Sequence, residues 1–189
     1  MKQFLATLIF LTIFLGSAGS VCAQGFDKGL KAYQSGDFAT AMKEWKLLAE
    51  QGNVDAQFNL GVMYENGQGV SKDSTEAMKW YRKAAEQGYS SAQRTLGFMY
   101  SQGEGVTQDY AEAVKWYRKA AEQGHADAQH NLGSMYRRGE GVTQDYAEAV
   151  KWYRKAAEQG DARAQSNLGL MYIQGKGVIQ DDAEAAKWY

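Results

Sequence analysis

Apolar residues recur at helical spacing through most of this chain. In the segment 89–124, Ala92, Leu96 and Met99 are separated by four and three residues, and Tyr100 follows directly. Residues at these spacings lie on one face of an α-helix. The second half of the segment carries another such stripe, which consists of Ala113, Trp116, Tyr117, Ala120 and Ala121. The pattern therefore predicts two helices in this segment, each with one apolar face.

This pattern returns with a period of 36 residues. Tryptophan recurs at that spacing, at Trp80, Trp116, Trp152 and Trp188. Glycine and glutamate keep the same period, at Gly52, Gly88, Gly124 and Gly160 and at Glu50, Glu86, Glu122 and Glu158. A fixed period of about 20 to 50 residues is typical of a solenoid, in which each unit buries its apolar face by stacking on its neighbours. The sequence therefore predicts an all-α solenoid of helix pairs.

Polar residues and glycine mark where the predicted helices begin and end. Asp109 is followed three residues later by Glu112, which is the pattern of a capping box at a helix N-terminus. The other units repeat it with Asp73 and Glu76, Asp145 and Glu148, and Asp181 and Glu184. Gly124 stands where the second helix should end, because a positive φ is favourable there without a side chain. Gly97 in the first helix is expected to let a neighbouring helix approach closely.

The repeated motifs match a known family. The first half of the unit contains Leu-Gly-x-Met-Tyr, the loop Gly-x-Gly-Val, and the second half Lys-Trp-Tyr-Arg-Lys-Ala-Ala-Glu-Gln-Gly. These motifs closely resemble Sel1-like repeats, which are relatives of tetratricopeptide repeats. The resemblance implies a right-handed α/α superhelical solenoid that acts as a protein-binding scaffold. The expected divisions are a signal peptide at 1–23, a degenerate tetratricopeptide-like first unit at 26–52, and Sel1-like repeats over 53–189, at 53–88, 89–124, 125–160 and an incomplete 161–189.

The first residues stand outside the repeat pattern. Lys2 precedes an apolar stretch at 4–15, and small residues follow up to position 23. This layout predicts a secretory signal peptide, and the apolar stretch is too short to span a bilayer. We therefore expect a mature chain that begins at Gln24 and is periplasmic or secreted. Lipid anchoring through Cys22, the only cysteine, stays open as an alternative, although the residues before it depart from a lipoprotein signal.

Composition and spacing argue against several kinds of chemistry. A net charge of −1 provides no basic stripe for nucleic acid. His125 and His130 are five residues apart, whereas metal ligands on one helix face are three or four apart. The second-helix glutamates Glu86, Glu122 and Glu158 stand four residues after Arg82, Arg118 and Arg154, which predicts ion pairs on a solvated face. No nucleophile and base can be paired, so we predict no catalytic residue, metal or cofactor.

The differences between repeats suggest a binding surface. Segments 106–124 and 142–160 are identical, whereas the first halves of the same two units differ, in a stripe opposite the apolar face. In tetratricopeptide-like solenoids the first helices line the concave groove, so the resemblance implies a groove with different side chains in each repeat. Drift on an exposed face is the alternative. The candidate groove residues are Phe58, Val62, Glu65, Arg94, Phe98, Ser101, His130, Ser134, Arg137, Ser166, Leu170 and Ile173.

These candidates predict the chemistry of the groove. Exposed Phe58 and Phe98, with Leu170 and Ile173, would make an apolar groove. Arginines, including Arg138, would orient an acidic ligand.

Two functions follow from the sequence. The first is an exported, non-enzymatic scaffold that binds a protein or peptide through its concave face, with the partner and the oligomeric state left open. The alternative is a cell-wall enzyme, because some cysteine-rich relatives of this family are associated with β-lactam binding or hydrolysis. Those relatives carry paired cysteines in each repeat, and this chain has none after Cys22.

Overall fold

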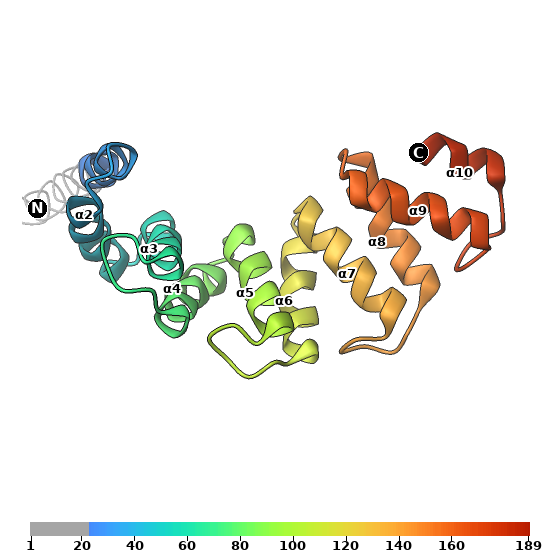
Figure 1. Ribbon diagram of the computed structural model, residues 1–189, viewed down its shortest axis with the longest axis horizontal. Coiled ribbons are helices and arrows are strands. Elements are labelled where there is room, and N and C mark those ends of the chain that lie inside the picture. The colour runs from blue at the N-terminus through green and yellow to red at the C-terminus, as the bar shows by residue number, and fades with distance from the viewer. Residues whose placement is uncertain (1–22) are drawn as a thin grey trace, which may run out of the picture. The chain divides into compact units, whose positions relative to one another are not determined.

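The computed structural model describes residues 23–189, and helices follow one another along this range (Figure 1). Residues 23–34 are helical. The helices that follow are α2 (Phe38–Glu50), α3 (Val54–Asn66), α4 (Ser74–Glu86), α5 (Ser90–Gln102), α6 (Tyr110–Glu122), α7 (Ala126–Arg138), α8 (Tyr146–Glu158), α9 (Ala162–Gln174) and α10 (Asp182–Trp188). No strand occurs among the described residues. The predicted signal peptide lies outside them except for Ala23, which is helical.

The chain divides into two compact units, one that ends at Asp73 and one that spans Ser74–Tyr189. In the first unit, residues 35–37 join the helix 23–34 to α2, and α2 packs against α3. Trp45 of α2 is 2% exposed and its ring lies beside those of Phe26 and Tyr33. This tryptophan fills the core of the first helix pair.

In the second unit each helix packs against the next one along the chain, from α4 through α10. The core repeats with the sequence, because each first helix buries an alanine, a leucine and a methionine and each complete second helix buries a tryptophan and a tyrosine. The predicted helix pairs and their apolar faces are therefore confirmed.

Glycine in the first helices allows the close packing of each pair. A Cβ atom added at Gly97 would lie 2.6 Å from the ring of Tyr117, and one at Gly133 would lie 2.9 Å from the ring of Tyr153. Both tyrosines are buried second-helix residues, at 3% and 0% exposure. The expectation that Gly97 permits a close helix approach is confirmed.

At the helix N-termini the aspartate of the predicted motif accepts a backbone hydrogen bond, whereas the glutamate pairs with a lysine. The carboxylate of Asp109 accepts a hydrogen bond from the backbone N–H of Glu112 at 3.0 Å, and Asp181 does the same for Glu184 at 2.8 Å. The glutamate of each of these motifs forms an ion pair with a lysine three residues later, for example Lys187 at 2.5 Å from Glu184. Gly124 adopts a φ of 89° after α6, as expected.

The second-helix arginines form different contacts from those predicted. Instead of pairing with the glutamate four residues later, each donates a hydrogen bond to a tyrosine hydroxyl on the first helix of the next repeat. The donor and acceptor atoms are 2.5 Å apart for Arg82 and Tyr100, 2.6 Å for Arg118 and Tyr136, and 2.6 Å for Arg154 and Tyr172. These hydrogen bonds connect successive repeats.

Candidate functional site

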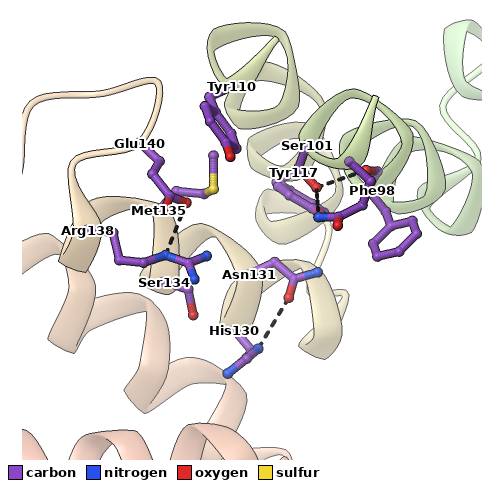
Figure 2. A pocket seen from close by; sticks show the side chains of 11 residues that line it. Phe98, Ser101, Tyr110, Tyr117, His130, Asn131, Ser134, Met135, Arg138 and Glu140 are labelled. Carbon is purple, nitrogen blue, oxygen red and sulfur yellow. Dashed lines mark hydrogen bonds and ion pairs between the residues drawn. The ribbon is translucent and has the colours of Figure 1, made fainter. Parts of the chain in front are cut away.

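A cavity of about 300 Å³ lies among α5, α6 and α7. Figure 2 shows residues of α5 and α6 on one side of it and residues of α7, from His130 to Arg138, on the other. Its lining consists of Phe98, Ser101, Gln102, Tyr110, Tyr117, His130, Asn131, Ser134, Met135, Arg138 and Glu140. We call it the large cavity.

Most polar groups around the large cavity already have partners. Ser101 is 6% exposed and its hydroxyl donates to the carbonyl of Phe98 at 2.8 Å. Arg138 forms an ion pair with Glu140, with 3.0 Å between Nε and Oε2. Burial raises the pKa of Tyr117, which favours the neutral phenol further. The lining therefore combines aromatic and polar side chains and leaves no uncompensated charge on Arg138 or Glu140.

A second, smaller cavity of about 60 Å³ lies among α7, α8, α9 and the loop after α9. It is lined by Arg137, Tyr146, Asn167, Leu170, Met171, Gln174 and Lys176. We call it the small cavity.

The two cavities are the same feature in consecutive repeats. Every residue of the small cavity stands 36 positions after a residue of the large one. Three columns keep their residue type, namely Tyr110 and Tyr146, Asn131 and Asn167, and Met135 and Met171. Four columns change, namely Ser101 to Arg137, Ser134 to Leu170, Arg138 to Gln174, and Glu140 to Lys176. Replacing two serines by arginine and leucine fills space, which explains the smaller volume.

His130 connects the two cavities through hydrogen bonds. Its Nδ1 lies 3.3 Å from Oδ1 of Asn131, and its Nε2 lies 3.2 Å from Nδ2 of Asn167. A neutral imidazole satisfies both contacts, with Nδ1–H as donor and Nε2 as acceptor. Burial lowers the pKa of His130, which favours this neutral form.

The structure brings together only some of the predicted groove residues. Phe98, Ser101, His130 and Ser134 line the large cavity, and Arg137 and Leu170 line the small one. The remaining candidates of the second unit, Arg94, Ser166 and Ile173, line neither cavity. Phe58, Val62 and Glu65 lie on α3 in the first unit and are half-buried.

One expectation about these residues needs correction. Phe58 and Phe98, expected to be exposed, are half-buried. Phe98 and Leu170 line different cavities, and the apolar groove expected from them stays a prediction.

Sequence reasoning missed several cavity residues. Tyr110, Glu140 and Lys176 lie outside the first-helix stripe from which the candidates came. Lys176 and Glu140 belong to the loop after the first helix and occupy the same repeat column. A comparison of the loops at the 36-residue period would have found this column, because its charge reverses between the two repeats.

The described residues contain no cluster of three potential metal ligands. In the same part of the chain, no helix has the length and apolar character needed to cross a bilayer.

The fold and the repeated cavities define a helical-repeat protein of the α-solenoid class. Matches to the Sel1 repeat cover residues 54–89, 90–125, 126–161 and 162–189. The chain therefore belongs to the Sel1 repeat family.

Solved structures of related proteins agree with this assignment. A Sel1 repeat protein from Oxalobacter formigenes is 43% identical, with a TM-score of 0.83 over 87% of this chain and 68% of that one. The protective antigen c5321 of uropathogenic Escherichia coli, which has an SLR fold, is 42% identical, with a TM-score of 0.88 over 94% of this chain and 39% of that one. This chain thus spans well under half the length of c5321. The cysteine rich protein B of Helicobacter pylori is 28% identical, with a TM-score of 0.50 over 65% of this chain and 93% of that one. No curated protein matches this sequence.

Proposed function

We propose that this protein is an exported, non-enzymatic scaffold that binds a protein or peptide partner along its first-helix face. The observation that carries the proposal is the repetition of one cavity in consecutive repeats with a constant frame and changing side chains. The frame residues Tyr110, Asn131 and Met135 return as Tyr146, Asn167 and Met171. Such an arrangement presents two similar subsites in consecutive repeats, which suits an extended chain that places one side chain in each.

The hydrogen bonding of the cavity supports a binding role over catalysis. Ser134 is the more exposed of the two serines that line the large cavity, so it is the better candidate for a nucleophile. Its Oγ lies 3.0 Å from the hydroxyl of Tyr153. His130 is the one histidine that lines either cavity, and its two ring nitrogens contact Asn131 and Asn167. The serine therefore has no base in contact with it, whereas nucleophilic catalysis needs one within hydrogen-bonding reach.

Filling the large cavity tests the proposal. Ser134→Leu installs the residue that the next repeat has in this column, so the fold is expected to tolerate it. A tagged protein produced in its source cells and cross-linked there should capture a partner that the Ser134→Leu variant loses. Lys115→Ala, on the exposed face of α6, is the matched control and should capture as the unaltered protein does. Equal capture by both variants, with unchanged melting temperatures, would contradict a role for this cavity.

Export is proposed from the N-terminal sequence, where an apolar stretch at 4–15 is followed by small residues. We expect the natively expressed protein to begin at Gln24, and intact mass spectrometry measures this directly. A lipid-modified Cys22 would place the protein on a membrane surface, and a retained Met1 would contradict processing.

A further inference from the structure

The two cavities differ most in charge. In the large cavity Arg138 is paired with Glu140. In the small cavity the corresponding residues are Gln174 and Lys176, and Arg137 replaces Ser101. The small cavity is therefore lined by two cations and no carboxylate, although the same frame encloses it.

Neither cation of the small cavity is neutralised by the protein. Arg137 donates a hydrogen bond from Nε to the hydroxyl of Tyr153 at 3.3 Å, and the ammonium of Lys176 lies 5.6 Å from the ring centre of Tyr146. Within residues 23–189 neither side chain forms an ion pair. An arginine held by one hydrogen bond to a tyrosine keeps its remaining N–H donors for a carboxylate.

The volumes indicate what each cavity accommodates. A volume of about 60 Å³ corresponds to roughly two water molecules, which is enough for a carboxylate and one methylene. A chain terminus would also have to place its Cα and side chain there, so an aspartate or glutamate side chain fits better. The large cavity, at about 300 Å³, is lined by Phe98, Tyr110 and Met135 and has room for an aromatic ring.

We propose that the ligand is an extended peptide segment that places an acidic side chain between Arg137 and Lys176 and an aromatic side chain in the large cavity. This proposal rests on the binding function proposed above and specifies its partner. Both cavities include residues of α7, and neighbouring helices pack about 8–10 Å apart, so we take the separation of the two cavities as roughly 10 Å. At about 3.3 Å per residue in an extended chain, the acidic and aromatic residues stand about three positions apart.

A displayed library of random linear peptides tests the proposal on the purified full chain. Selection should enrich segments with an aspartate or glutamate about three residues from an aromatic residue. Binding of an enriched synthetic peptide, measured by fluorescence anisotropy, should weaken at least tenfold when its acidic residue becomes asparagine or glutamine.

Substitutions in the protein, each of which installs the residue of the preceding repeat, complete the test. Arg137→Ser and Lys176→Glu each install the residue of the preceding repeat at that column, and together they should abolish the preference for the acidic residue. Lys46→Glu, at an exposed residue of α2 that lines neither cavity, repeats the charge change of Lys176→Glu and should leave binding unaltered.

The outcomes separate this inference from the function on which it rests. Enriched peptides that bind without an acidic residue, and that lose binding in Ser134→Leu, would overturn the inference and leave the binding function in place. Failure to enrich any peptide that depends on Ser134 would overturn both. Peptides that bind only through a free terminal carboxylate would also overturn the side-chain assignment.

Discussion

The hydrogen bond between Arg118 and Tyr136 should contribute measurably to the coupling of adjacent repeats. Arg118 lies in the second helix of one repeat, and Tyr136 belongs to the first helix of the next. Nη2 lies 2.6 Å from the phenol oxygen, and the guanidinium carbon lies 5.9 Å from the ring centre. In a solenoid, stability is the sum of intrinsic repeat terms and interface terms, so this contact belongs to an interface term.

The magnitude follows from the type of contact and its exposure. A hydrogen bond to a charged group contributes about 1.5–3 kcal/mol when it is buried. Arg118 and Tyr136 are both half-buried, so solvent competes for this hydrogen bond. We therefore expect a coupling free energy of about 1 kcal/mol between Arg118→Ala and Tyr136→Phe. Each single variant should melt roughly 2–4 °C below the unaltered protein.

A double-mutant cycle measures this coupling. Urea unfolding is followed by tryptophan fluorescence, since Trp116 and Trp152 are buried in the repeats that flank the contact. The control cycle combines Arg118→Ala with Tyr172→Phe, because Tyr172 accepts its hydrogen bond from Arg154 instead. The control should be additive. If both cycles give the same coupling, the contact does not connect the repeats energetically.

Three further predictions concern packing, pH and capping. Gly97→Ala should destabilise the fold by about 1–2 kcal/mol, because overpacking against the ring of Tyr117 outweighs the gain in helix propensity, and an unchanged melting temperature would contradict the close packing. Burial lowers the pKa values of His125 and His130, so the stability that their neutral forms supply is complete above their ordinary pKa and is lost as the pH falls. Urea unfolding at pH 7.5 and pH 5 should therefore show a smaller loss of stability in acid for His130→Ser than for the unaltered protein. Asp161→Ala should cost about 1 kcal/mol in thermal unfolding, because its carboxylate accepts a backbone hydrogen bond at the start of α9, and an unchanged melting temperature would refute the cap.

The sequence predicted the helices, their ends and their apolar faces because these depend on neighbours within one or two turns. The contacts of Arg118 were not predictable by that reasoning, since its partner Tyr136 is 18 residues away on another helix. The i+4 rule considers residues of the same helix alone, and so it favoured Glu122. The cavities were found in part, because helical spacing selected Phe98 and Ser134 but could not place the loop residue Lys176 beside Arg137.

The distribution of constant and changing residues indicates how this fold accommodates different ligands. Met135 and Met171 are each 2% exposed and belong to the core as well as to the cavity lining, so replacing them would cost packing energy. Ser134 and Leu170 stand one residue earlier on the same helices, line the cavities, and are more exposed than the methionines. A substitution in that column changes the volume available to a ligand and leaves the interface between repeats intact. Because the two cavities share this frame, each residue found in one cavity is a ready-made variant for the other. Exchanging such residues separates the contribution of a side chain to recognition from its contribution to folding.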